Sequence, residues 1–274
     1  MIVMLTAEKE GGQVKAHNYW SDKRLGPFTL QQLSERRASL EPAKINRHRR
    51  PTASRKQSTE PAPPLARIDS SAAVSTDQPF VTVRKLTLSH EGFPFERMRE
   101  ITQLQYSSWP DFGAPAHPAH LLGLVEQCDA VVRTTTGTKH SEPDPPNSRP
   151  VLVHCSAGCG RTGTFCTVDT VIDMLKRQRN ARRTRQGTPM DVDPIEKQSQ
   201  SPFFSSSSLT AGNTGNDEVN GDWLAKENQD LIEKVVEEFR HQRISMVQSL
   251  RQFVLCYESI MEWLTEQDHL ENDT

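Results

Sequence analysis

The sequence of 274 residues has few apolar and aromatic residues, no long hydrophobic run and almost no net charge. Hydrophobic residues make up 34% of it and aromatic residues 6%, which is less apolar than an ordinary globular domain. No run is long enough to span a membrane and no secretory signal is present, so we expect an intracellular, reducing setting. The five cysteines, an odd number, are then expected to be free thiols. A net charge of −2 gives no overall field that would attract nucleic acid or an anionic membrane, and we expect binding to neither.

Two long stretches lack the apolar residues that a packed core requires. Residues 36–78 and 177–222 are dominated by polar and charged residues and contain almost no aromatic ones. Such stretches bury too little apolar surface to offset the conformational entropy of the chain. We expect both to be disordered insertions and residues 266–274 to form a C-terminal tail. A basic segment at 44–56 adds nuclear import as an alternative to the cytoplasmic location that we expect.

The segments between these stretches show the periods of strands and helices. A hairpin is expected over 2–20 with its turn near Gly11 and Gly12, and alternation predicts strands at 80–88 and 99–109. The short apolar run at 151–155 is typical of a strand buried on both faces. Helical spacing is found at 118–134, 161–178, 228–243 and 246–264. Because strands precede and separate the helices, we expect an α+β fold of α/β-like character, with a mixed, twisted sheet flanked by helices.

Each helical segment places its apolar residues on one face, which we expect to pack on the core. These residues are Leu121, Leu124, Val125 and Val131 or Val132 in the first helix; Phe165, Val168, Ile172 and Leu175 in the second; Leu231, Val235 and Phe239 in the third; and Leu250, Phe253 or Val254, Tyr257 and Leu264 in the fourth.

The stretch "VLVHCSAGCGRTGTF", residues 151–165, carries the strongest chemical signal. Gly158 and Gly160 have no Cβ and permit a tight, partly left-handed turn between the strand and the helix. Such a turn points backbone N–H groups inward, and with a helix N-terminus it forms a phosphate site. In that field the pKa of Cys155 falls below its ordinary value of about 8.5. The planar guanidinium of Arg161 can hold two phosphate oxygens, so the stretch predicts phosphate binding and attack on phosphorus by sulfur.

Residues 154–163, "HCSAGCGRTG", resemble the signature of the protein tyrosine phosphatases, H-C-S-A-G-x-G-R-[ST]-G, with a match at every fixed position. The resemblance implies a cysteine-phosphatase fold with Cys155 as the nucleophile. It also implies that Thr162 hydrogen-bonds the sulfur and that His154 tunes it. The implied phosphate-binding residues are Ser156, Ala157, Gly158, Cys159, Gly160 and Arg161. An isolated Cys-x5-Arg also occurs around cysteines that are inert packing, and the longer string makes that alternative the weaker one.

A second motif, "WPDFGAP" at 109–115, resembles the mobile acid loop of the tyrosine-specific members of this family. A tyrosyl oxygen is a poor leaving group until it is protonated, and a carboxylic acid can supply the proton. The resemblance gives this role to Asp111, with Trp109 as the anchor of the loop and Phe112 as the cover over the substrate. The alternative is an ordinary turn.

Two weaker correspondences complete the site. "RISMVQSLRQFVLCY" resembles the family's glutamine loop, in which Gln248 positions the hydrolytic water and Gln252 supports it; the alternative is that both lie on the polar face of a helix. "EGGQVKAHNYW" resembles the segment whose acidic residue, here Glu10, orients Arg161, while Lys15 faces the acid loop. Both charges could equally be solvated hairpin residues.

The resemblance covers 1–35, 79–176 and 223–265, which we expect to form a partial phosphatase domain. We expect the N-terminal part that carries the family's phosphotyrosine-recognition loop to be absent, and the long polar insertions resemble those of fungal members. The expected activity is hydrolysis of phosphotyrosine in proteins through a phosphocysteine, with no metal or other cofactor and with phosphotyrosine proteins as partners. The alternatives are a catalytically weak phosphotyrosine-binding remnant and a dual-specificity phosphatase, a class that lacks the combination of Trp-Pro-Asp and glutamine loop. Substrate and oligomeric state are not predicted.

Overall fold

A computed structural model of the chain describes residues 1–21, 23–41, 79–134, 136–145, 150–187, 222–225 and 228–272. Most of the two expected insertions, and the basic segment 44–56, lie outside these residues. The strands are β1 (Ile2–Met4), β2 (Lys9–Glu10), β3 (Gln13–Val14), β4 (Lys23–Leu25), β5 (Phe28–Ser39), β6 (Phe80–His90), β7 (Arg99–Gln105) and β8 (Leu152–His154). The helices are α2 (Pro118–Arg133), α3 (Gly160–Gly187), α4 (Asp222–Ala225), α5 (Leu231–Gln242) and α6 (Leu250–Asn272).

Six strands form one mixed sheet in the order β4-β5-β6-β7-β1-β8. The long strands β5, β6 and β7 pair antiparallel, whereas β1 lies parallel to both β7 and β8. The expected turn at Gly11 and Gly12 closes a separate small hairpin of β2 and β3, so β1 belongs to the main sheet and not to the hairpin. The mixed sheet and the helices beside it make this an α+β fold, as the sequence predicted.

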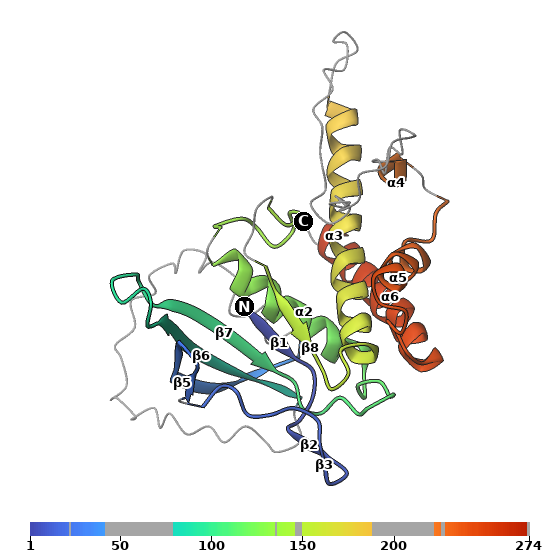
Figure 1. The fold of residues 1–274 in the computed structure, drawn as a ribbon. Helices are drawn as coiled ribbons and strands as arrows, with labels where there is room; N and C mark the ends of the chain where they lie inside the picture. The colour runs from blue at the N-terminus through green and yellow to red at the C-terminus, as the bar shows by residue number, and fades with distance from the viewer. Residues whose placement is uncertain are drawn as a thin grey trace, which may run out of the picture.

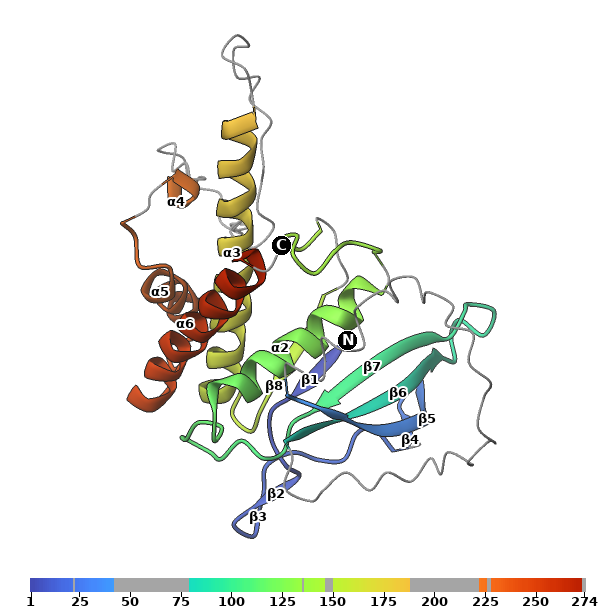
Figure 2. The same cartoon turned by 180° about the vertical axis from the view of Figure 1, so that it is seen from behind.

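Helices cover one face of the sheet, and the two sheet faces carry different residues. α2 lies along the sheet, and α3, α5 and α6 pack together beyond it (Figures 1 and 2). Alternation along β1 points Val3 into the main core with these helices and Met4 to the opposite face. That opposite face has a smaller apolar cluster of Met4, Trp20, Leu30 and Leu86. It also carries the polar residues of β6 and β7 that are described below.

The buried face of α5 matches the sequence prediction and those of α2 and α3 match it in part, because Val131, Val132 and Leu175 are only half-buried, while α6 does not match. Phe165, Val168 and Ile172 of α3 are buried, as are the expected residues of α5 and the leucines and Val125 of α2. In α6, however, Leu250 is 78% exposed. The buried stripe is instead Gln252, Leu255, Cys256, Ser259, Ile260 and Trp263. The apolar pattern misled because Gln252 and Ser259 share the buried face with Leu255 and Cys256, and this turns the buried stripe away from Leu250.

Several expected boundaries and one expected burial were wrong. β5 continues to Ser39, α3 continues to Gly187 and α6 continues to Asn272, so each extends into a stretch that we expected to be disordered or a tail. β8 is not buried on both faces, because it is the edge strand of the sheet and Leu152 is 60% exposed. Among the described residues, no helix combines the length and the apolar character needed to cross a bilayer.

Candidate active site

Cys155 follows β8 directly and lies in a loop that leads into the N-terminus of α3. Gly158 turns this loop with φ 69°, a conformation that favours glycine, and its N–H donates to the Cys155 sulfur at 3.2 Å. Burial by itself would raise the pKa of the thiol. The favourable electrostatics of the Thr162 hydroxyl and of the backbone N–H groups of Thr162, Cys159 and Gly158 outweigh burial, and they hold the pKa of Cys155 below its ordinary value. The Thr162 hydroxyl itself makes no close hydrogen bond among the described residues. The loop therefore favours a thiolate.

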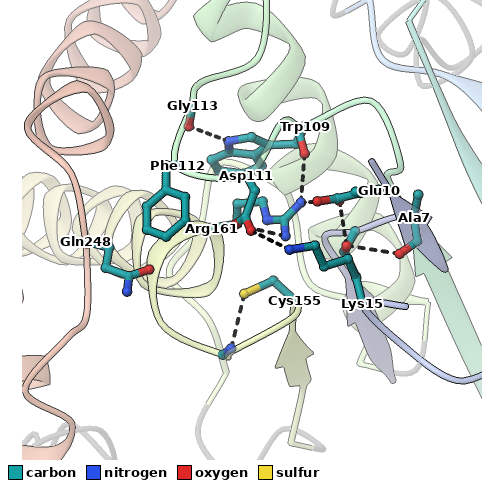
Figure 3. Close-up of polar contacts among 12 residues, drawn as sticks. Ala7, Glu10, Lys15, Trp109, Asp111, Phe112, Gly113, Cys155, Arg161 and Gln248 are labelled. Atoms are coloured by element: carbon teal, nitrogen blue, oxygen red, sulfur yellow. Dashed lines mark hydrogen bonds and ion pairs between the residues drawn. The ribbon is translucent and has the colours of Figure 1, made fainter. Parts of the chain in front are cut away.

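Arg161 is 1% exposed and is held by groups from two distant segments (Figure 3). Its Nη1 donates to Glu10 Oε1 at 2.5 Å and to the Trp109 carbonyl at 2.9 Å, and its Nη2 donates to Asp111 Oδ1 at 3.3 Å. Burial would raise the pKa of Glu10, but hydrogen bonds from Arg161 and Thr6 hold it below its ordinary value. Arg161 Nε is buried and has no partner among the described residues. A phosphate oxygen would satisfy this donor.

The acid loop is fixed by the buried side chain of Trp109, and it carries Asp111 to a position over Cys155. Trp109 is fully buried, and its Nε1 donates to the Gly113 carbonyl at 2.9 Å, which fixes the turn that carries Asp111. The Asp111 carboxylate lies between Arg161 and Lys15, whose Nζ is 3.1 Å from Oδ2. Phe112 is 60% exposed at φ 55°, an uncommon conformation for a bulky residue. In Figure 3 the Asp111, Phe112 and Gln248 side chains surround the space over Cys155.

The glutamine loop is built around a buried amide. Gln252 is 1% exposed, and its Oε1 accepts the backbone N–H groups of Gln248 at 3.0 Å and Ser249 at 3.2 Å. The Ser249 hydroxyl donates to the Phe112 carbonyl at 3.0 Å and so joins this loop to the acid loop. A Cβ at Gly160 would lie 2.8 Å from Gln252 Oε1 and 3.2 Å from Gln248 Oε1. Glycine at this position therefore allows the glutamine loop to pack directly on the phosphate loop.

The remaining phosphate-loop residues are held from outside by Arg243. Its Nη2 donates to the Ala157 carbonyl at 2.8 Å and its Nε lies 3.1 Å from the Cys159 sulfur. One guanidinium thus ties the Ala157 carbonyl to the Cys159 side chain. Ser156 and Ala157 are exposed at the mouth of the loop, whereas Cys159 is buried beneath it.

His154 is tied to a residue that the sequence did not single out. Its Nδ1 lies 3.2 Å from the Cys155 carbonyl, and its Nε2 is 2.7 Å from the Tyr19 hydroxyl. Tyr19 was missed because it lies 135 residues before His154, and no local pattern reports such a contact. Arg243 is the first residue of the stretch that resembles the glutamine loop, and the sequence suggested no role for it. Among the described residues, no cluster of histidine, cysteine, aspartate and glutamate could hold a metal ion.

A buried cysteine in a ring of N–H groups, with an arginine beside it on a mixed sheet, defines the class of cysteine-dependent phosphatases. Comparison with known proteins points, within this class, to the phosphatases that act on tyrosine. Residues 66–192, a little under half of this chain, match the family model described as protein-tyrosine phosphatase.

Curated relatives and solved structures agree with this family. Tyrosine-protein phosphatase Lar of Drosophila melanogaster is 39% identical over 98 residues, which are 36% of this chain and 4% of that protein. Human tyrosine-protein phosphatase non-receptor type 18 is 49% identical over 80 residues, 29% of this chain and 15% of that protein. A crystal structure of the catalytic domain of the human type 18 protein has a TM-score of 0.51 at 22% identity, over 96% of this chain and 59% of that one. Another solved structure contains the type 18 protein, PTPN18, in complex with HER2-pY1248 phosphopeptides, with a TM-score of 0.50 at 21% identity over 95% of this chain and 61% of that one. The structural likeness shows the shared fold, and this chain spans less than two thirds of each of these proteins.

Proposed function

We propose that this chain hydrolyses phosphotyrosine in proteins through a phosphocysteine intermediate. One observation carries the proposal. The buried guanidinium of Arg161 is oriented by Glu10 and has an unsatisfied Nε, while Asp111 on the same guanidinium is placed above Cys155. Nucleophile, phosphate clamp and acid are thus assembled by contacts between segments about 50 and 150 residues apart, an arrangement that general packing does not require. That PTPN18 forms a complex with phosphopeptides supports phosphotyrosine proteins as the substrate class.

In the first step the thiolate of Cys155 attacks phosphorus. The loop N–H groups and Arg161 stabilise the charge on the equatorial oxygens. A bound phosphate would accept a hydrogen bond from Arg161 Nε, which has no partner among the described residues, and it would compete with Asp111 for the hydrogen bond from Nη2. Phosphate binding would thereby release Asp111 from Arg161. Beside the negative charge of the phosphate the released carboxylate takes up a proton from solvent, and it then gives this proton to the tyrosyl oxygen as the P–O bond breaks and the P–S bond forms.

In the second step a water molecule cleaves the phosphocysteine. Asp111, now ionised, accepts a proton from that water, and the Gln248 amide orients it for attack on phosphorus. Cys155 leaves as a thiolate, which the Thr162 hydroxyl and the loop N–H groups stabilise. The chain's own residues supply every group in this scheme.

The test compares hydrolysis of an aryl phosphate and of a phosphotyrosine peptide by the wild type, Cys155→Ser and Asp111→Ala. We expect no turnover from the first variant and a loss of about 10²–10⁴-fold in kcat from the second, the range for general acid catalysis. Both variants should still bind the phosphopeptide. A folded wild type that binds the peptide without turning it over would refute the proposal and favour a phosphotyrosine-binding remnant. Turnover of a phosphoserine peptide at a comparable rate would favour dual specificity.

We also propose a reducing compartment, the cytoplasm, as the site of action, because the reaction requires Cys155 as a thiolate and the five cysteines are all free thiols. Fractionation of cells that produce the full-length protein, followed by detection with an antibody, tests this proposal. A protein found only in an oxidising compartment would contradict it.

A further inference from the structure

The second face of the sheet, opposite the helices, carries a buried polar cluster that the proposed reaction does not use. Arg84 of β6 lies directly across from Gln103 of β7 in the strand register and one diagonal step from Gln105. All three are at most 7% exposed. Arg84 Nη1 donates to Gln103 Oε1 at 3.0 Å and to Gln105 Oε1 at 2.7 Å. One guanidinium nitrogen therefore fixes the orientation of two buried amides.

The amide of Gln103 begins a chain of hydrogen bonds that ends at the cysteine loop. Gln103 Nε2 donates to the Tyr19 hydroxyl oxygen at 2.9 Å, and that hydroxyl is 2.7 Å from His154 Nε2. On its other side, His154 Nδ1 lies 3.2 Å from the Cys155 carbonyl. We call this chain the His154 arm.

The direction of the His154 arm follows from the chemistry of its two ends. An arginine can only donate and a carbonyl can only accept. Gln103 must therefore present its Oε1 to Arg84 and its NH₂ to Tyr19. An imidazole with one ring proton that donates to the Cys155 carbonyl through Nδ1 leaves Nε2 as an acceptor, so the Tyr19 hydroxyl donates to His154 Nε2. His154 then carries its own proton on Nδ1 and donates it to the Cys155 carbonyl. If the Gln103 amide rotated by half a turn, it would offer an oxygen to the Tyr19 hydroxyl and draw that proton away from His154.

The amide of Gln105 begins a second chain, which ends at the phosphate clamp and which we call the Glu10 arm. Gln105 Nε2 donates to the Thr6 carbonyl at 3.2 Å, and the Thr6 hydroxyl donates to Glu10 Oε1 at 2.7 Å. The same Glu10 oxygen accepts from Arg161 Nη1 at 2.5 Å. The position of Arg161 thus depends on a loop that Gln105 holds from the second face of the sheet.

We propose that Arg84 is a positioning residue that aligns the Cys155 loop through the His154 arm and Arg161 through the Glu10 arm. The proposal concerns the site of the proposed phosphatase and rests on that function. Two contacts keep Arg84 in place without belonging to either arm: Glu35, whose Oε2 is 2.7 Å from Nε, and the Trp20 ring, whose centre is 4.5 Å from the guanidinium carbon. Arg84 does not touch the substrate, so its effect is on geometry alone.

Two measurements report on the arms separately, and neither needs turnover. The pH midpoint of Cys155 alkylation by iodoacetate reports on the His154 arm, because that arm orients the loop whose N–H groups stabilise the thiolate. Calorimetric binding of inorganic phosphate reports on the Glu10 arm. The calorimetry is done in the Cys155→Ser background, where the charge of the sulfur does not enter. The ¹⁵N shifts of the His154 imidazole give its tautomer directly.

Arg84→Met should disturb both arms. We expect the alkylation midpoint to rise by about one pH unit, which is tenfold less thiolate at low pH. We also expect phosphate affinity to fall about tenfold and His154 to lose its uniform Nδ1–H tautomer. Arg84→Lys, which keeps a donor-only cation, should restore part of each effect. Glu35→Gln is the matched control, because it removes the ion pair of Arg84 and leaves both arms intact; all three readouts should equal those of the wild type.

Two further variants test each arm without touching the buried arginine, in case Arg84→Met does not fold. Tyr19→Phe should raise the alkylation midpoint and leave phosphate affinity within twofold. Gln105→Met should weaken phosphate binding and leave the midpoint unchanged. A folded Arg84→Met protein that changes neither readout would overturn the proposal, and so would folded Tyr19→Phe or Gln105→Met proteins that change neither readout or change both equally. A wild type with a low midpoint and tight phosphate binding but no turnover would instead refute the phosphatase function, so the two failures are distinguishable.

Discussion

The Glu10–Arg161 pair allows a test in which charge is removed while shape is kept. Glu10→Gln preserves the size of the side chain and an oxygen for Arg161, but it replaces a charge-assisted hydrogen bond of 2.5 Å with a neutral one. Hydrogen bonds to charged groups contribute about 1.5–3 kcal/mol and neutral ones about 1 kcal/mol, so the loss is about 0.5–2 kcal/mol. If that interaction holds Arg161 in place for the transition state, kcat/KM should fall by about 2- to 30-fold, since about 1.4 kcal/mol is a factor of ten.

The same substitution has a pH signature. The pKa of Glu10 is lowered in the folded protein by its bonds to Arg161 and Thr6. As pH falls, the unfolded chain therefore binds this proton first. Glu10 adds stability above its unfolded pKa of about 4.3, and that stability is lost as pH falls through the lower folded pKa. The difference in unfolding free energy between wild type and Glu10→Gln should thus be largest near pH 7 and should shrink below about pH 4.

The assay is steady-state hydrolysis of an aryl phosphate at pH 7, with urea unfolding at several pH values. Glu8→Gln is the matched control, because Glu8 is an exposed glutamate on the same segment and lies outside the site. It should leave both quantities unchanged. A Glu10→Gln protein with the kcat/KM of the wild type and the same stability difference at pH 7 and pH 3.5 would refute the role of this pair.

Three other substitutions test separate parts of the structure. Thr162→Ala removes a hydroxyl that lowers the pKa of Cys155, so the pH midpoint of alkylation should rise; an unchanged midpoint would contradict this electrostatic role of the hydroxyl. Gly160→Ala places a Cβ 2.8 Å from Gln252 Oε1 and should displace the glutamine loop. Rapid-mixing kinetics should then show a burst followed by slow hydrolysis of the phosphocysteine, and a proportional loss in both steps would contradict this reasoning. Asp230→Ala removes the N-cap of α5, whose carboxylate accepts the N–H groups of residues 232 and 233, and should cost about 1 kcal/mol in thermal unfolding with kcat unchanged.

The parts of the site that lie close together in the sequence could be predicted from it, because their geometry is local. The strand, the turn at Gly158 and the helix that begins at Gly160 are adjacent in sequence, so their residue types alone predict the loop and its inward N–H groups. The same holds for the helical faces of α3 and α5. Family resemblance extended the prediction to Asp111, Gln248, Glu10 and Lys15, which the structure places around the loop (Figure 3).

The failures have a common physical cause, which is that burial depends on neighbours that periodicity does not report. Gln252 is more deeply buried than Leu250 because its amide accepts the backbone N–H groups of the glutamine loop. β8 reads as a central strand, yet the order of the sheet places it at an edge. The contacts of Arg84 with Gln103 and Gln105 depend on strand register, which neither β6 nor β7 specifies alone.

The contact between Arg161 and Asp111 couples the acid loop to substrate binding, because a bound phosphate would compete with Asp111 for the same guanidinium. Asp111 Oδ1 accepts a hydrogen bond from Arg161 Nη2, and Asp111 Oδ2 accepts one from Lys15 Nζ. A phosphate that binds Arg161 carries more charge than one carboxylate, so it should displace Asp111 from the guanidinium while Lys15 keeps the carboxyl near the leaving oxygen. Lys15→Met should therefore leave phosphate affinity within twofold and lower kcat, because the released Asp111 carboxyl would lose the ammonium group that keeps it near the leaving oxygen. An equal loss in phosphate affinity and kcat would show that Lys15 holds the phosphate and not the acid.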